Sequence, residues 1–116
     1  MVAIDTKVFS IVGAGIGGLA AALALQRTGA RVQIYEQAPE LGEVGAGLTI
    51  SPNASHVLDH LGLRPQLREF GTVLGAGAVR HYATNEILIN TPVGTLDEQV
   101  EEFGNINYQI HRADLH

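Results

Sequence analysis

Residues Val8–Glu36 read VFSIVGAGIGGLAAALALQRTGARVQIYE, and this run governs the architecture of the chain. Its order predicts an apolar strand over 7–12, a glycine turn, a helix over 15–28 and a second strand over 31–36. The glycines follow the spacing G-x-G-x-x-G, and the acid Glu36 comes about 20 residues later, as in dinucleotide-binding βαβ units.

Each glycine of this motif has a physical role. Gly13 lets the chain turn sharply, the bare backbone at Gly15 admits a pyrophosphate, and Gly18 lets the helix pack closely on the strands. The helix start adds N–H groups and a positive dipole end, which attract phosphate. Glu36 is placed to accept hydrogen bonds from both ribose hydroxyls of an adenosine. A 2′-phosphate would meet a like charge there, so the pattern favours FAD or NAD over NADP; the alternative is a glycine turn that binds no nucleotide.

Length and composition predict one domain or part of one. The chain has 116 residues, is 46% hydrophobic, carries a net charge of −5 and lacks cysteine. The acidic balance argues against nucleic acid and against a membrane surface as partners. Without cysteine there is neither a disulfide framework nor a thiolate nucleophile. The N-terminus lacks a signal-peptide pattern and the apolar run is too short to span a bilayer, so we expect a cytoplasmic protein.

The region after Glu36 predicts a loop followed by two helices. Residues 37–47 hold one proline and three glycines, and a short strand is expected over 48–50. Ser51 is expected to cap a helix with Pro52 at its first position. Four apolar residues then fall on one helical face, and Gly62 ends that helix: these are Ala54, Val57, Leu58 and Leu61. A shorter helix is expected over 65–70.

The last third predicts an antiparallel ribbon and a further strand. Residues 73–83 and 86–91 read as two strands joined by Thr84-Asn85. The acidic run over 97–102 is typical of a solvated loop or a short helix. A strand is expected over 105–110, with a helix beginning at Arg112. His56 and His60 lie four apart on one helix, but they lack a third ligand, so no metal site is predicted.

Taken together, these residues resemble the FAD-dependent aromatic hydroxylases, the single-component flavoprotein monooxygenases typified by salicylate hydroxylase and para-hydroxybenzoate hydroxylase. The match runs through IVGAGIGGL at 11–19, YEQAPELGEVGAG at 35–47, SPNA at 51–54, LGL at 61–63 and HRADL at 111–115. The fold class that follows is α/β: a Rossmann-like FAD-binding βαβ unit with a parallel sheet, plus an antiparallel β-ribbon. It is incomplete relative to the full family fold.

The resemblance also implies a cofactor site. By position, the pyrophosphate would lie on Gly13, Ala14, Gly15, Ile16 and Gly18, and the adenosine ribose on Glu36 with Gln37 beside it. The backbone at Gly47 would lie by the FAD, and Arg112 would reach its ribityl-pyrophosphate. Arginine at a helix start is otherwise unfavourable, because the positive dipole end repels it unless an anion is near.

The implied activity is that of an NAD(P)H-dependent monooxygenase. FAD would be reduced by NAD(P)H and would react with O2 to a flavin hydroperoxide, which hydroxylates a small aromatic substrate. No residue here is assigned a catalytic role. The family's later Asp-Gly and Gly-Asp flavin motifs are not found within 1–116, so we interpret the chain as the N-terminal part of an FAD-binding domain, inactive by itself and prone to self-association through exposed apolar surface. The alternatives are a truncated, non-catalytic nucleotide-binding fragment and an NAD-binding dehydrogenase domain, which would have a third parallel strand soon after Glu36.

Overall fold

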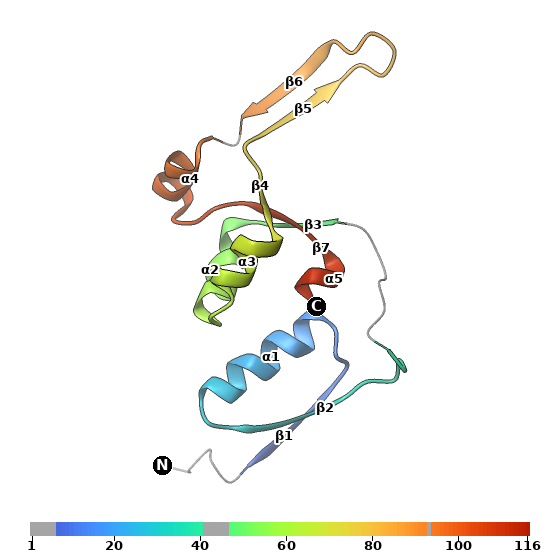
Figure 1. Cartoon of the computed structure of the whole chain (residues 1–116), viewed down its shortest axis with the longest axis vertical. Helices are drawn as coiled ribbons and strands as arrows, with labels where there is room; N and C mark the ends of the chain where they lie inside the picture. The colour runs from blue at the N-terminus through green and yellow to red at the C-terminus, as the bar shows by residue number, and fades with distance from the viewer. Residues whose placement is uncertain (1–6, 41–46, 93) are drawn as a thin grey trace. The chain divides into compact units, whose positions relative to one another are not determined.

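The computed structural model describes residues 7–40, 47–92 and 94–116. The chain divides into two compact units (Figure 1). The first comprises Met1–Ala46 together with Arg112–His116, and the second comprises Gly47–His111. Most of the predicted loop over 37–47 lies outside the described residues.

The first unit contains the predicted βαβ arrangement. Strand β1 (Val8–Val12) leads into helix α1 (Ile16–Arg27), and β2 (Arg31–Tyr35) follows. The two strands are parallel, with Val8 opposite Arg31 and Val12 opposite Tyr35. A short helix, α5 (Arg112–Leu115), belongs to the same unit. The predicted strands and helix are confirmed to within a residue or so at each end.

Helix α1 is less buried than its composition predicts. We expected a helix that is apolar nearly all round to be covered on more than one side. Ala22 is its one buried residue, whereas Ala21 and Ala24 are exposed. The expectation is wrong for this structure because, among the described residues, β1 and β2 form a 2-stranded sheet, which covers a single side of the helix. None of the helices in the described ranges is both long and apolar enough to cross a bilayer.

The second unit is organised by a 3-stranded antiparallel sheet in the order β3-β7-β4. Its strands are β3 (Gly47–Ile50), β7 (Tyr108–His111) and β4 (Thr72–Val73). Helices α2 (Pro52–His60) and α3 (Arg64–Phe70) connect β3 to β4. The strand after β2 is therefore antiparallel to its neighbour, which is not the third parallel strand that a dehydrogenase domain would require. The buried apolar residues of this unit are Ile50, Leu61, Leu67, Tyr108 and Ile110.

Helix α2 begins and ends where predicted, but one residue of its predicted apolar face is exposed. Ser51 occupies the N-cap position and Pro52 the first turn, yet the Ser51 hydroxyl donates to the Asn53 side chain at 2.5 Å and does not cap the backbone. Val57, which shares that face with Leu58 and Leu61, is 56% exposed. Ser55 is fully buried, and its hydroxyl lies 3.0 Å from the carbonyl oxygens of Pro52 and Ile106, so its polar group is satisfied.

The predicted ribbon exists, but its first strand is shorter than expected. Strands β5 (Ala76–Arg80) and β6 (Ile87–Pro92) pair antiparallel, with an irregular register between Val79 and Arg80. The single strand expected over 73–83 is wrong, since β4 pairs with β7 and the chain leaves the ribbon after Arg80. The connecting turn spans 81–86 rather than two residues, and Asn85 adopts a φ of 59° within it.

The acidic run forms helix α4 (Leu96–Phe103), in agreement with the short-helix interpretation. Thr95 and Glu98 form a capping box, in which the Thr95 hydroxyl accepts from the Glu98 N–H and the Glu98 carboxylate accepts from the Thr95 N–H. The carboxylates in the first turn also favour the positive end of the helix dipole. Gly104 ends the helix at φ 74°.

Gln99 of α4 forms hydrogen bonds to the chain at both ends of the ribbon. Its side chain is 1% exposed, and its amide nitrogen donates to the carbonyls of Leu74 at 2.9 Å and Gly94 at 3.2 Å. Its amide oxygen accepts from the backbone of Asn107 at 2.9 Å. Leu74 precedes β5 and Gly94 follows β6, so one buried amide fixes the chain on both sides of the ribbon.

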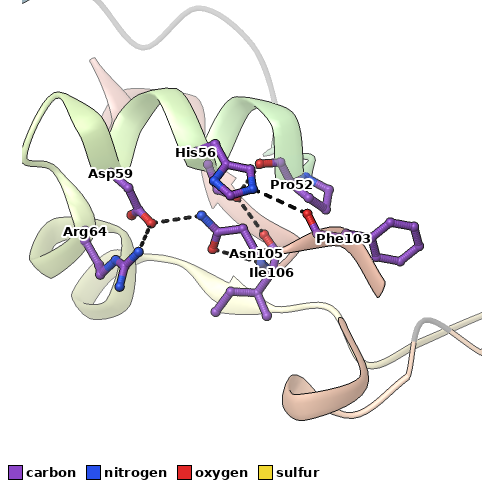
Figure 2. A network of polar contacts seen from close by, with 8 residues as sticks. Pro52, His56, Asp59, Arg64, Phe103, Asn105 and Ile106 are labelled. Carbon is purple, nitrogen blue, oxygen red and sulfur yellow. Dashed lines mark hydrogen bonds and ion pairs between the residues drawn. The ribbon is translucent and has the colours of Figure 1, made fainter. Parts of the chain in front are cut away.

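A second polar network joins α2 to the segment before β7 (Figure 2). Asp59 forms an ion pair with Arg64 and accepts from the Asn105 amide at 2.8 Å. Asn105 in turn accepts from the N–H of Ile106 at 2.9 Å. The Nε2 atom of His56 lies 3.4 Å from the carbonyl oxygen of Phe103.

Candidate functional site

The glycine turn is held between the ends of β1 and β2. Gly13 adopts a φ of +97°, a conformation that L side chains disfavour. Its N–H donates to the carbonyl of Tyr35 at 2.7 Å, which fastens the start of the turn to the end of β2. The first glycine of the motif is thus required for the turn, as the sequence predicts.

The other two motif glycines differ in what surrounds them. A Cβ at Gly18 would lie 2.0 Å from the carbonyl oxygen of Gly13 and 3.4 Å from the Ile11 side chain, so this position requires glycine for close packing. A Cβ at Gly15 would meet no atom within 4 Å. Gly15 is therefore dispensable for packing, and the space beside its backbone is open.

Glu36 is fixed beside this turn by backbone hydrogen bonds. One carboxylate oxygen accepts from the N–H of Ala14 at 2.6 Å, and the other accepts from the N–H of Ala38 at 2.9 Å. These bonds, that from Ala38 most and that from Ala14 next, hold the pKa of Glu36 below its ordinary value of 4.5. The N–H of the exposed residue Gln37 adds to the effect. Glu36 therefore stays charged at neutral pH, with its carboxylate fixed in position at the mouth of the turn.

The start of α1 is suited to an anion. Gly15 is the N-cap residue and offers no side-chain cap, and the first turn carries no acidic residue. The N–H groups around Ile16 and the positive dipole end therefore lack a side-chain counterpart from the helix itself. Open space at Gly15, helix N–H groups and a fixed ribose-type acceptor together fit the adenosine and pyrophosphate half of a dinucleotide.

The remaining predicted site residues lie in two different units. Arg112 opens α5 and belongs to the same unit as the glycine turn. Gly47 is the first residue of β3 in the second unit, where it pairs with His111. The preceding residues Gly45 and Ala46 fall outside the described ranges. The structure thus gathers residues 13–18, Glu36 and Gln37 in one place and leaves Gly47 in the other unit.

His116 lies against this turn, although no motif in the sequence points to it. Its Nε2 atom lies 2.5 Å from the carbonyl oxygen of Ala14, in the middle of the glycine turn. The motif spacing does not reveal this contact, because the two residues are joined only through the fold. The one available signal is that His116 directly follows the family-like HRADL segment at 111–115.

Several known proteins are similar to this chain in sequence. Residues 11–64 match the family described as NAD(P)-binding Rossmann-like domain. A 3-hydroxybenzoate 6-hydroxylase of Polaromonas naphthalenivorans (strain CJ2) is 46% identical over 107 residues, covering 91% of this chain and 26% of that protein. A 6-hydroxynicotinate 3-monooxygenase of Pseudomonas fluorescens is 38% identical over 107 residues, covering 92% of this chain and 27% of that protein.

Solved structures also resemble this chain over most of its length. HpxO of Klebsiella pneumoniae, complexed with FAD and uric acid, superimposes with a TM-score of 0.80 at 30% identity, covering 94% of this chain and 26% of that one. The tetrameric form of 2-methyl-3-hydroxypyridine-5-carboxylic acid oxygenase gives a TM-score of 0.77 at 25% identity, covering 96% and 27%. The chain is homologous to the N-terminal portion of the FAD-dependent aromatic hydroxylases. It spans about a quarter of the length of the curated relatives it matches.

Proposed function

We propose that this chain binds the adenosine and pyrophosphate half of FAD and serves as the FAD-binding portion of an NAD(P)H-dependent aromatic monooxygenase. The observation that carries the proposal is the Glu36 carboxylate held 2.6 Å from the Ala14 N–H, beside an open glycine turn. A charged acceptor fixed at this position serves ribose hydroxyls, and the turn serves the phosphates that follow. The flavoprotein relatives and the FAD complex of HpxO support FAD as the dinucleotide.

The residues take separate parts in this proposal. The pyrophosphate is held by the backbone of the glycine turn and the start of α1, and the adenosine ribose by Glu36 with Gln37 beside it. Arg112 supplies a multi-donor cation for the phosphates from α5. Gly47 is included among the cofactor-binding residues because of the resemblance alone. The full list is Gly13, Ala14, Gly15, Ile16, Gly18, Glu36, Gln37, Gly47 and Arg112.

The chemistry of the whole protein would come from the cofactor. Bound FAD, reduced by NAD(P)H, supplies the electrons with which O2 hydroxylates a small aromatic ring. The residues of this chain bind and orient the far end of the cofactor. The relatives named above act on hydroxylated benzoates and nicotinates, which makes such compounds the first substrates to test.

NAD is the second candidate ligand, because the matching family is described as NAD(P)-binding. NAD and FAD share the adenosine diphosphate half, so the glycine turn and Glu36 suit both. The antiparallel pairing of β3 with β7 favours FAD, since an NAD-binding dehydrogenase domain continues with a further parallel strand after β2. Competition between FAD and NAD for the purified protein decides between the two.

The substitution Gly15→Ala tests the proposal sharply, because its methyl group meets no protein atom. We expect an unchanged melting temperature and a loss of FAD affinity of at least tenfold, because the methyl occupies space meant for the pyrophosphate. Gly17→Ala is the matched control, since a Cβ there also meets nothing within 4 Å. FAD binding is followed by quenching of flavin fluorescence. Equal FAD affinity in both variants, or no FAD binding by the unmodified protein, contradicts the proposal.

The monooxygenase activity is tested separately. Purified protein with FAD, NADH or NADPH and a panel of hydroxybenzoates and hydroxynicotinates is assayed for oxygen uptake and for a hydroxylated product. We expect product only from a protein that also contains the flavin-ring and substrate regions. The 116-residue chain should bind cofactor without turnover. Turnover by this chain alone would contradict the assignment to a cofactor-binding portion.

We also propose that the chain self-associates through its ribbon. Apolar side chains of β5 and β6 are about half exposed, which leaves a hydrophobic surface on a two-stranded ribbon whose outer edges are open in the described chain. The residues concerned are Val79, Ile87 and Ile89.

A further inference from the structure

We infer that His116 is a positioning residue of the nucleotide site, which holds the Ala14–Gly15 peptide in the orientation that phosphate binding requires. The inference rests on the proposed function and extends it to a residue outside the glycine motif. It starts from the contact between the His116 ring and the Ala14 carbonyl, which links residues 102 apart in sequence.

The chemistry of this contact determines which ring nitrogen carries a hydrogen. A carbonyl oxygen only accepts hydrogen bonds, so the His116 Nε2 atom at 2.5 Å must carry the hydrogen. Ala14 is 6% exposed, so the acceptor lies in a buried residue. The ring also lies near Glu36: the N–H groups of Ala38 and Ala14 lower the pKa of that carboxylate most, and the charge of His116 lowers it further.

Two consecutive peptide groups of the turn are therefore held from outside the motif. Glu36 binds the Ala14 N–H, which belongs to the Gly13–Ala14 peptide. His116 binds the Ala14 carbonyl, which belongs to the Ala14–Gly15 peptide. In a trans peptide the C=O and N–H point in opposite directions, so holding the Ala14 carbonyl directs the Gly15 N–H away from the His116 ring.

The sequence explains why such an anchor is needed. Ala14 is flanked by Gly13 and Gly15, whose backbones have the widest choice of φ and ψ. An unanchored peptide between two glycines rotates readily, and each misaligned N–H reduces the preorganisation of an anion site. Glu36 restrains the first peptide and His116 the second, so the turn is already ordered before a phosphate arrives.

The test compares His116→Leu with His116→Gln in the purified protein. Leucine removes the donor, whereas glutamine places an amide N–H near the position of Nε2. We expect H116L to weaken ADP and FAD binding by about tenfold, and H116Q to retain most of the affinity. His60→Leu is the control, because His60 is an exposed residue of α2 in the second unit. Affinities are measured by isothermal titration for ADP and by fluorescence quenching for FAD.

Amide NMR spectra separate this inference from the proposed function. H116L should shift the Gly15 amide signal without ligand, and H116Q should restore it. If the unmodified protein binds neither ADP nor FAD, the proposed function fails, while the Gly15 signal still tests the positioning role. An unmoved Gly15 signal in H116L, or equal ADP affinity in H116L and the unmodified protein, overturns the inference. If H116L does not fold, the nitrogen chemical shifts of the His116 imidazole in the unmodified protein test the inference. A His116 ring without a hydrogen on Nε2 contradicts the positioning role.

Discussion

The carbonyl oxygen of Gly13 occupies the place that a side chain on Gly18 would need. A Cβ built at Gly18 lies 2.0 Å from that oxygen, far inside van der Waals contact. The first and last glycines of the motif are thus matched to one another: one makes the turn, and the other lets the helix approach it.

This relationship predicts that Gly18→Ala destabilises the chain by about 1–3 kcal/mol, as overpacking a tight contact does. The backbone oxygen has little room to move, so the helix must shift and FAD binding should fall with stability. Urea unfolding measures the loss. Gly17→Ala is the matched control, since its Cβ meets nothing and alanine is the better helix former, so stability should stay equal or rise by up to ~1 kcal/mol. An equally stable G18A would contradict the packing argument.

Glu36→Gln should weaken FAD binding while the chain still folds. The amide has one acceptor oxygen, so it can satisfy the N–H of Ala14 or that of Ala38 but not both, and it carries no charge. We expect a loss of about tenfold to a hundredfold in FAD affinity, measured by fluorescence titration. Glu40→Gln makes the same chemical change at an exposed residue nearby in the chain. Equal losses in both variants would show that general charge, rather than the Glu36 contact, governs binding.

Gln99→Leu should be among the most destabilising substitutions in the second unit. Leucine has a similar volume but leaves the Leu74 and Gly94 carbonyls and the Asn107 N–H without their buried partner. The expected cost is roughly 2–4 kcal/mol in the free energy of unfolding, from urea titration. Gln66→Leu, on the exposed side of α3, should change stability by less than about 0.5 kcal/mol. A Q99L variant as stable as Q66L would remove the case for Gln99 as an anchor of the ribbon.

Asp59 should contribute stability that disappears in acid. Its hydrogen bonds, first to Arg64 and then to Asn105, hold its pKa below the ordinary 3.8. The unfolded chain therefore binds the proton more readily than the folded chain, so this stabilisation is full above pH 3.8 and is lost as pH falls through the lower folded pKa.

The measurement compares Asp59→Asn with the unmodified chain in urea at several pH values. We expect the free energies of unfolding of the two proteins to differ by about 1–3 kcal/mol at pH 7, and this gap to narrow only in the acid range. In an Arg64→Met background the gap should be smaller, because the ion pair is already gone. A gap that does not change with pH would show that Asp59 acts through shape and not through charge.

Ile89→Lys should reduce self-association of the chain. Ile89 lies opposite Val79 across the ribbon, and the two side chains are 54% and 52% exposed. Lysine on this face places a charge in any apolar contact and should bring the sedimentation coefficient to that of a monomer. Asn90→Lys adds the same charge to the other face of β6, because successive side chains alternate, and should leave association unchanged. A monomeric profile of the unmodified chain would dismiss the proposed contact.

The elements that the sequence predicts well are those with local signals. The glycine spacing, Pro52 at a helix start and Gly62 at a helix end all act within a few residues, and the structure agrees with them. Apolar periodicity in α2 predicts neither the exposure of Val57 nor the burial of Ser55. The deciding contact, from the Ser55 hydroxyl to the Ile106 carbonyl, comes from a segment far along the chain.

The same distinction separates the two parts of the candidate site. Glycine positions and Glu36 follow from motif spacing, since each acts through its own backbone or its place at a strand end. His116 could not be found in this way, because its partner Ala14 lies 102 residues away. The break between β4 and β5 has no local signal either. It arises because Thr72 of β4 pairs with the distant residue Gln109 of β7, whereas β5 pairs with β6.

The strand order β3-β7-β4 has a consequence for synthesis of the chain. The central strand of this sheet is the last to leave the ribosome, and its residues Tyr108–His111 pair with both Gly47–Ile50 and Thr72–Val73. Until it emerges, the two outer strands have no partner in this sheet. The second unit therefore closes late, through contacts between distant residues, and nascent chains stopped before Tyr108 should remain open to proteases.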